Sequence, residues 1–464
     1  MLKAREPGSV SGLHHVGIKK RSLTEDLIRD FFRFFDIEDK APERGAFAAC
    51  CEYWGLGTED LNRAMKRAAR YHRTALPSMR RILGIYLREW MAPFDSSCRR
   101  RVYYNVPGTI SFMYFLREIL KNGEAGVYAG SPDFISMVVL YGIFGRKKRI
   151  ETGSCRHCAV NLMRASLMED PAFPAADLLV SFGFTCDEAT RQDAMLRPAG
   201  EGLLRVFVMN PVRSERSPAY IEERLRDLLS QVRRRFALSS MAQQMEREIY
   251  RGCKSARFRL AVKVHQIIDH VGGSGSFWIT NNDIVFLESL LITSFQCGMQ
   301  ELEETLSKLM EEIKKDTAED VRKIHRRFCV YYTPICNPDY GEVMEENGIA
   351  LLDHTAFSSS ALVTGKKDPC EDASLEAMGM LIAGPAVEEG RKIADLIRRK
   401  ELDGFVSGMF AFDRWMGMQQ FQLKTIIEET TGKTVFLYDT DFWNQESFAR
   451  DRLETAVETL TYML

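Results

Sequence analysis

Apolar residues recur at helical spacing through the first hundred residues of the chain and again across its middle. The segments 23–37 and 58–91 place apolar side chains three or four positions apart and lack strand-like alternation, which predicts a mainly helical N-terminal region. The segments 217–237 and 299–316 are also amphipathic. The apolar stripe of the last segment consists of Leu302, Leu306, Leu309 and Ile313. The pattern therefore predicts helices at the start and in the middle of the chain.

Two other regions alternate short apolar runs with amphipathic stretches. Strand, helix, strand, helix is typical of a parallel α/β sheet. The predicted strands lie within 123–131, 175–184, 203–210, 326–333, 349–354, 405–410 and 433–439. Glycines that separate helix from strand, at Gly348, Gly404 and Gly432, predict left-handed helix caps.

We therefore expect an α/β protein with two doubly wound parallel-sheet domains, a helical segment that joins them, and a helical N-terminal region. The predicted boundaries are 1–105 for the helical N-terminal region, 106–216 for the first α/β domain, 217–320 for the helical link, and 321–464 for the second α/β domain. In such sheets ligands bind beyond the carboxyl ends of the strands.

Composition and charge exclude several classes of function. The net charge is -1 and the pI is about 6.7, which gives no bulk electrostatic case for nucleic acid or an anionic membrane. The N-terminus has no apolar signal region, and the longest apolar run, 134–144, is too short to span a bilayer. We therefore expect a cytoplasmic protein, in which the 11 cysteines are thiols rather than disulfides.

Three of these thiols, Cys155, Cys158 and Cys186, crowd into a short span of the first α/β region. A structural zinc site needs a second pair of ligands, whereas Cys186 stands alone. A redox dithiol needs a strand directly before it, and residues 149–154 are a poor strand. Thiolates from separate loops at strand ends suit an iron–sulfur cluster. The residues alone leave two readings open, a cluster and ordinary buried thiols.

Two stretches that look like phosphate-binding loops do not qualify. The glycines of 271–276 follow no predicted strand and lack the spaced third glycine of a dinucleotide loop. The Gly-Lys-Thr at 432–434 lies between a helix and a following strand, the reverse of a P-loop, and Ile427 stands where the loop's first glycine belongs. The sequence therefore indicates no nucleotide site in this chain.

From about residue 105 to the C-terminus, the order of segments resembles the D-component family of 2-hydroxyacyl-CoA dehydratases, which includes subunits of ATP-dependent benzoyl-CoA reductase. The segments that carry the resemblance are 126–145, 153–166, 175–191, 203–228, 256–268 and 402–460. No single motif decides it; their order and spacing together do.

The resemblance implies an iron–sulfur subunit of an oxygen-sensitive radical enzyme. In this family three cysteines of a subunit hold a [4Fe–4S] cluster, and an ATP-dependent activator protein supplies one electron. The implied reaction is dehydration of a 2-hydroxyacyl-CoA or reduction of benzoyl-CoA, performed on an acyl-CoA substrate together with a second homologous subunit. We do not expect nucleic acid or a membrane among the partners of this protein.

Carried onto this chain, the resemblance matches Cys186 to the family's second cysteine and either Cys155 or Cys158 to the first. The third is missing, because the segment 408–413 offers no thiol. Three possibilities stay open: Cys155, Cys158 and Cys186 together form a rearranged site, Cys336 supplies the third thiolate, or the cluster is lost. The residues that stand where the family has its third cysteine are Phe410, Ala411 and Phe412.

The sequence thus predicts a lyase or reductase subunit with Cys155, Cys158 and Cys186 as cluster thiolates. Two rival interpretations remain. In one, the chain is a structural or electron-relay subunit whose partner carries the active site. In the other, it is a double-cubane-type reductase of small molecules, which needs about six converging thiols.

Overall fold

The computed structural model has its elements in the following order, beginning with the helical N-terminal region. Its described residues are 23–106, 110–123, 126–145, 159–183, 187–196, 204–209, 217–238, 243–318, 321–331, 337–355, 366–379, 385–407, 414–438 and 448–463. The first half comprises α1 (Glu25–Phe34), α2 (Ala41–Trp54), α3 (Thr58–Tyr71), α4 (Pro77–Met91), the 3-10 turn η1 (Ala92–Phe94), β1 (Arg100–Tyr104), α5 (Ile110–Gly123), β2 (Val127–Gly130), α6 (Pro132–Met137), the π-helix η2 (Val138–Phe144), α7 (Ala159–Glu169), β3 (Leu178–Gly183), α8 (Asp187–Met195), β4 (Leu204–Met209) and α9 (Ser217–Arg235). The second half comprises α10 (Gln243–Ser274), α11 (Asn281–Ser289), α12 (Gly298–Lys315), β5 (Arg326–Val330), α13 (Pro338–Glu346), β6 (Ile349–His354), α14 (Pro369–Met378), α15 (Ala386–Arg399), β7 (Gly404–Ser407), α16 (Arg414–Thr431), β8 (Thr434–Leu437) and α17 (Arg450–Met463).

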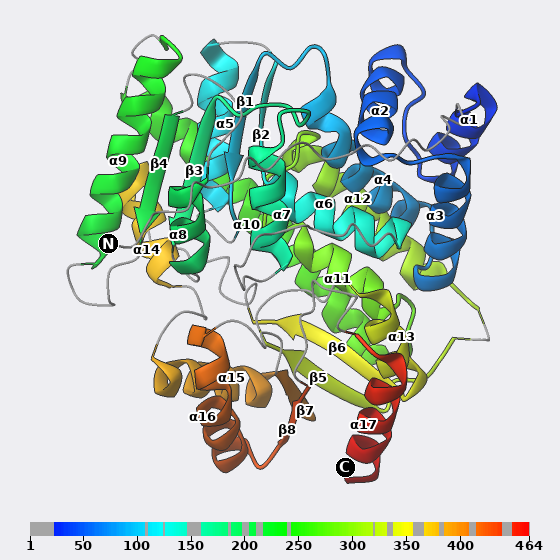
Figure 1. Cartoon of the computed structure of the whole chain (residues 1–464). Coiled ribbons are helices and arrows are strands. Elements are labelled where there is room, and N and C mark those ends of the chain that lie inside the picture. The colour runs from blue at the N-terminus through cyan, green and yellow to red at the C-terminus, as the bar shows by residue number, and fades with distance from the viewer. Residues whose placement is uncertain are drawn as a thin grey trace, which may run out of the picture.

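Two four-stranded parallel sheets confirm the predicted α/β class. Their orders are β2-β1-β3-β4 and β6-β5-β7-β8, so the second sheet repeats the topology of the first. The chain moves outward in one direction from β1 and in the other from β3, and the same reversal separates β5 from β7. In doubly wound folds such a reversal marks where ligands bind, beyond the carboxyl ends of the strands. Figure 1 shows β3 and β4 of the first sheet directed toward the second sheet.

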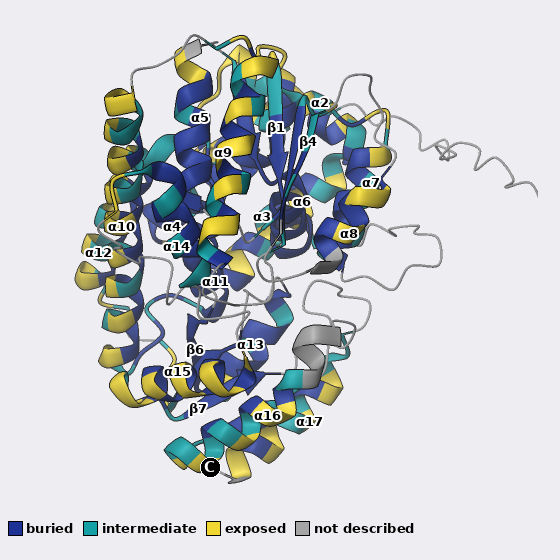
Figure 2. Cartoon of the chain, turned by 90° about the vertical axis from the view of Figure 1, so that its left-hand side faces the viewer, coloured by how far each residue is buried: buried dark blue, intermediate teal, exposed yellow. Residues whose placement is uncertain are grey.

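Alternating side chains bury both faces of the first sheet. Val102 and Tyr104 of β1 lie in one apolar cluster with α5, α9 and α14, whereas Tyr103 between them joins the cluster formed by the N-terminal helices and α11. Because successive side chains of a strand point to opposite faces, one strand serves both cores. Figure 2 shows α11 buried and α12 exposed along its outer face.

Several local predictions are confirmed and others are corrected. Leu302, Leu306, Leu309 and Ile313 of α12 are buried together. Gly348 and Gly432 have positive φ, as predicted for helix caps. At the end of α15 the left-handed residue is instead Glu401, and Gly404 begins β7, where a Cβ atom would collide with the Phe328 ring. Helix α10 runs on to Ser274, into the glycine-rich stretch 271–276 that was rejected above as a phosphate-binding loop.

Strand β1 is the main element that the sequence pattern missed. Its residues 100–104 fall within the region predicted to be helical and begin with two arginines, yet β1 is a central strand that pairs with both β2 and β3. Helix α14 is a second surprise, because it follows β6 of the second sheet but packs mainly on α9 and α5 beside the first. The boundaries at 105, 216 and 320 stay predictions.

Among the described helices, none is both long enough and apolar enough to cross a bilayer.

Candidate functional site

The sequence-predicted ligands stand next to well-placed helices. Helix α7 begins at Ala159 and α8 at Asp187, so Cys158 and Cys186 each directly precede the first residue of a helix. Outside the described residues lie Cys155, Cys158, Cys186, Cys336, Phe410, Ala411 and Phe412. The structure therefore informs on the surroundings of the predicted ligands and leaves the ligand set itself a prediction.

A buried guanidinium joins the two helices that follow these cysteines. Arg164 is the sixth residue of α7, and its Nε lies 2.7 Å from Oδ1 of Asp193, the seventh residue of α8. On its other side, Nη1 of Arg164 lies 3.5 Å from Oδ2 of Asp133. The other oxygen of Asp133 accepts a 2.7 Å hydrogen bond from the Ser131 hydroxyl. Ser181 of β3 donates to Asp193. The salt bridge thus ties α7 and α8 at similar distances from their first residues.

This cluster holds two carboxylates for one cation. The side chains of Asp133, Arg164 and Asp193 are at most 1% exposed. Burial raises the pKa of Asp133 above its ordinary value, although Arg164 acts in the opposite direction. The two buried carboxylates therefore depend on a single guanidinium, that of Arg164, for their charge compensation.

An asparagine closes the first sheet at its topological reversal. Beyond the ladder pair Tyr104–Val180, the Asn105 side chain donates to the carbonyl of Phe182 at 2.7 Å and accepts from the Phe182 amide at 2.6 Å. The amide group therefore continues the β1–β3 pairing by one further step with a side chain. This bond holds the two carboxyl ends where a ligand is expected.

A nine-residue segment, 288–296, runs from the second sheet to the first, and we term it the interdomain strap. The Ser294 amide donates to the Tyr104 hydroxyl at 2.7 Å, and the Ser294 hydroxyl donates to the carbonyl of Ala129 at 2.8 Å. Gln296 donates to the same carbonyl at 3.1 Å. These contacts attach the strap to the carboxyl-terminal parts of β1 and β2.

At its other end the strap holds the last residue of β6. The Glu288 carboxylate accepts the backbone N–H of His354 at 3.0 Å and contacts Nδ1 of the same residue, and both side chains are fully buried. Ser294 is six positions after Glu288 in the chain, so their Cα atoms are at most about 20 Å apart. The carboxyl edges of the two sheets therefore face one region of limited size.

A buried carboxylate on α4 contacts Gln296, the last residue of the strap. Glu89 of α4 is 2% exposed, and its Oε2 accepts the Gln296 amide at 2.7 Å. Its Oε1 faces the end of β2, where a Cβ atom on Gly130 would lie 2.9 Å away and closer still to the Tyr128 hydroxyl. Burial raises the pKa of Glu89 to about 7, while the Gln296 N–H and Arg117 lower it.

Glu89→Gln is expected to change how stability depends on pH. The folded-state pKa lies above that of the unfolded chain, so the carboxyl contributes fully below pH 4.5 and loses that contribution as pH rises through 7. The loss is about 3 kcal/mol above pH 7. Glutamine keeps an acceptor for the Gln296 amide, so the variant should gain stability over the wild type at pH 8 but not at pH 5.

Urea unfolding at both pH values measures this difference. Glu311→Gln provides the control, since the Glu311 side chain is 69% exposed. Equal pH dependence of wild type and Glu89→Gln would contradict the expectation.

Seven cysteines lie among the described residues: Cys50, Cys51, Cys98, Cys253, Cys297, Cys329 and Cys370. Burial raises the pKa of Cys253, Cys297 and Cys370 to about 12, which keeps these thiols protonated at neutral pH. In the part of the chain that the structure describes, no three His, Cys, Asp or Glu side chains come together as a metal site.

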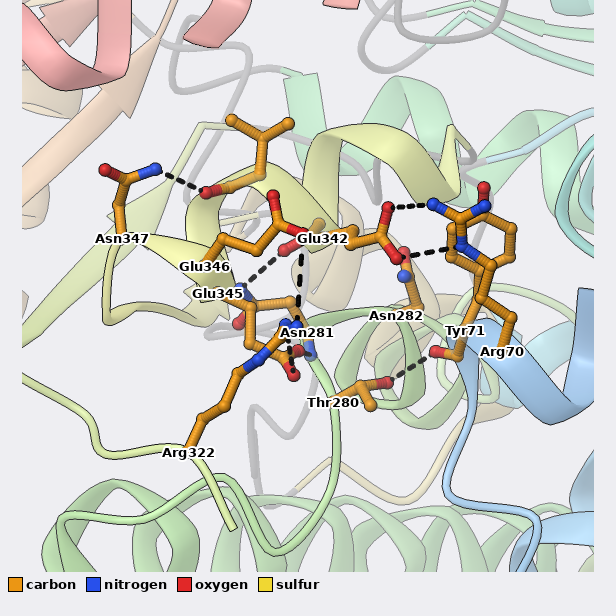
Figure 3. A network of polar contacts seen from close by, with 12 residues as sticks. Arg70, Tyr71, Thr280, Asn281, Asn282, Arg322, Glu342, Glu345, Glu346 and Asn347 are labelled. Atoms are coloured by element: carbon orange, nitrogen blue, oxygen red, sulfur yellow. Dashed lines mark hydrogen bonds and ion pairs between the residues drawn. The ribbon is translucent and has the colours of Figure 1, made fainter. Parts of the chain in front are cut away.

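Helix α11 is fixed in place by a dense polar network (Figure 3). The Asn281 amide donates to the carbonyls of Gly341 and Ile349 at 3.1 and 2.9 Å, and its oxygen accepts the Leu351 N–H at 2.9 Å. In the same view Arg70 of α3 forms a bidentate ion pair with Glu342 of α13, at 3.0 and 2.8 Å. The hydroxyl of Thr280, which caps α11, also donates to the carbonyl of Tyr71 at 2.9 Å, so α3 braces the helix that carries Glu288.

Sequence reasoning did not find Arg164, Glu288 or His354. His354 had a usable signal, a histidine at the end of a predicted strand in an α/β domain, where ligand-binding residues gather. Glu288 had none, because it is one acidic residue in an apolar helix 66 positions from its partner.

Comparison with known protein families agrees with this architecture. The family model described as 2-hydroxyglutaryl-CoA dehydratase, D-component, matches residues 144–464, whereas the resemblance seen in the sequence was expected from about residue 105. No curated protein matches the chain. The matched residues include β3 to β8, both helices that follow Cys158 and Cys186, and the interdomain strap. This chain therefore belongs to the 2-hydroxyglutaryl-CoA dehydratase D-component family.

Proposed function

We propose that this chain is the iron–sulfur subunit of a 2-hydroxyacyl-CoA dehydratase and carries a [4Fe–4S] cluster at the carboxyl edge of its first sheet. The family membership supports a dehydratase component. The observation that carries the cluster is the ion pair between Arg164 and Asp193, which ties together the two helices that directly follow Cys158 and Cys186 in the sequence. The candidate thiols are Cys155, Cys158, Cys186 and Cys336.

The donor set fits such a cluster. Soft thiolates are the ligands that iron–sulfur clusters take, and three of the four candidate thiols lie within 32 residues of sequence. Consecutive Cα atoms are about 3.8 Å apart, so Cys158 and Cys186 stay close to the starts of α7 and α8. The ion pair between Arg164 and Asp193 supports a common site for them, and Cys336 or Cys155 is the further ligand.

A cluster of this kind, with one iron not held by protein, supplies a Lewis acid and a one-electron carrier. This chain's own residues provide the frame: Asn105 holds β1 to β3 at the carboxyl edge, and the strap holds the two sheets together. We further propose a second homologous subunit, an ATP-dependent activator and an acyl-CoA substrate as partners.

The missing third family cysteine favours one alternative, an electron-relay or structural subunit without substrate chemistry. Its supporting observation is that 408–413 holds Phe410 and Phe412 but no thiol. A fused double cluster needs about six converging thiols, and the seven cysteines among the described residues form no group of metal ligands with one another.

Anaerobic purification followed by iron and acid-labile sulfide analysis, with EPR of the reduced protein, tests the proposal. We expect about four irons per chain. Cys158→Ala and Cys186→Ala should lose the iron, whereas Cys253→Ala, a partly buried thiol on α10, should keep it. Absence of iron after strictly anaerobic handling would contradict the cluster. Iron without dehydration of any 2-hydroxyacyl-CoA would favour the electron-relay alternative.

A further inference from the structure

The last two residues of β6 depart from regular strand geometry. Asp353 has φ of +57°, a left-handed conformation that costs a residue other than glycine about 1–2 kcal/mol. At the same place the pairing of β5 with β6 shifts register between Phe328 and Val330. An extra residue of this kind in a strand re-aims the side chain beside it, and such bulges are common next to active sites.

The shift turns His354 toward α11. Along the free edge of β6, the carbonyl of Ile349 and the N–H of Leu351 both bond to Asn281. In a regular strand the next N–H on this edge would be that of Asp353. Instead, the N–H of His354 faces that edge and bonds to Glu288. Lys400 secures the irregular residue, because its Nζ lies 2.6 Å from Oδ1 of the buried Asp353.

The result is a histidine with a fixed ring orientation. Glu288 holds both the backbone N–H and Nδ1 of His354, so the proton that this ring can exchange with a third group is the one on Nε2. Glu288 lies in the last turn of α11, where the helix itself does not stabilise a negative charge. The imidazole lies against this carboxylate, in the arrangement that orients histidines for proton transfer.

Two serine hydroxyls also lie buried at this edge. The hydroxyls of Ser289, next to Glu288, and of Ser407, at the end of β7, are fully buried and have no hydrogen-bond partner among the described residues. Ser407 lies beyond Val406, which is separated from His354 by a single strand, a distance of about 10 Å between backbones. Buried polar groups are almost always satisfied by protein, ordered water or ligand, so these hydroxyls are available to a water or a polar ligand at this edge.

We propose that His354 is the acid–base residue of the region between the two sheets, with Glu288 as its positioning residue. This rests on the proposed function. Dehydration of a 2-hydroxyacyl thioester breaks the Cα–O and Cβ–H bonds and forms the C=C bond. His354 gives its Nε2 proton to the departing hydroxyl, which leaves as water, and recovers a proton from Cβ. No net electron is gained or lost in this exchange.

The other titratable groups near the pair gather at Asp353. They are Asp353 of β6, Lys400 at the end of α15, His265 of α10 and Cys329 of β5. The test uses the complete enzyme, with its partner subunit and activator, purified anaerobically. Iron per chain, kcat and KM are measured between pH 5.5 and 9 for the wild type and for His354→Gln, Glu288→Gln and His270→Gln.

We expect His354→Gln to lower kcat by about 100-fold or more, with KM within about threefold. Iron content should be unchanged, and one limb of the pH profile should disappear. Glu288→Gln should lower kcat less and displace that limb, because it keeps an acceptor but loses the charge. His270→Gln, on the partly exposed part of α10, is the matched control and should match the wild type.

Three results would overturn the inference: a rate for His354→Gln within about threefold of wild type, an unchanged pH profile, or a rate lost only in proportion to iron. If the wild-type enzyme dehydrates no 2-hydroxyacyl-CoA, the proposed function fails and histidine-selective NMR decides the inference separately. The His354 ring signal, identified by its absence in His354→Gln, should then shift when 2-hydroxyglutaryl-CoA is added. An unmoved signal would leave the pair a structural contact.

Discussion

Replacing Arg164 with methionine is expected to lower the free energy of unfolding by about 3–5 kcal/mol, because removing one partner of a buried ion pair leaves an uncompensated charge. Here two carboxylates, Asp133 and Asp193, lose the same cation, and neither is in contact with water. Methionine has nearly the length of the arginine stem, so the loss reports on charge more than on packing. Urea unfolding followed by far-UV circular dichroism measures the change.

Arg100→Met is the matched control. Arg100 pairs with Asp177 at 3.1 Å, but its side chain is 40% exposed, and ion pairs of that kind contribute about 1 kcal/mol or less. If Arg164→Met unfolds at the same urea concentration as Arg100→Met, the buried cluster does not stabilise the fold as argued. Since Arg164 links α7 to α8, its replacement should also reduce the iron content predicted for the wild type.

Replacing Asn281 with alanine is expected to cost about 3–4 kcal/mol, because it leaves three buried backbone groups without their partners. The Asn281 amide covers the free edge of β6 as a neighbouring strand would, by bonding to the carbonyl of Ile349 and the N–H of Leu351. Unpaired edges of this kind are costly when water cannot reach them. Thermal and urea unfolding measure the loss.

The neighbouring position offers a close control. Asn282 lies on the same helix and is also buried, yet its amide makes one such bond, to the carbonyl of Pro338 at 3.1 Å. Asn282→Ala should therefore cost about 1 kcal/mol. Equal losses at the two positions would mean that the edge of β6 does not depend on Asn281. A selective loss of activity in Asn281→Ala with iron retained would link this contact to Glu288 on the same helix.

These predictions share one structural reason. The chain brings the carboxyl edges of two sheets together and spans them with the interdomain strap, whose contacts on both sides are buried. When mutation removes one of the buried charged or polar groups that hold this arrangement, water cannot take its place. Stability and the proposed chemistry therefore depend on the same small set of side chains.

The amino-acid sequence by itself determined the class of fold and most of its elements. Seven of the eight strands and the apolar stripe of α12 follow from local periodicity, which depends only on residues a few positions apart. The four cysteines proposed as ligands, Cys155, Cys158, Cys186 and Cys336, also came from the sequence. The family could also be recognised from the sequence, because the order and spacing of the segments can be read along the chain without knowing their contacts.

Only the tertiary structure decided which distant residues meet. Strand β1 was missed because it begins with two arginines and has only three apolar residues, too few to show a strand pattern. Its pairing with β2 and β3 is what makes it a core strand. Helix α14 follows the second sheet in sequence but covers the first, because its apolar face completes a core formed by α5 and α9. Glu288 and His354 meet because a register shift in β6 turns one of them toward the other, and no local pattern encodes that contact.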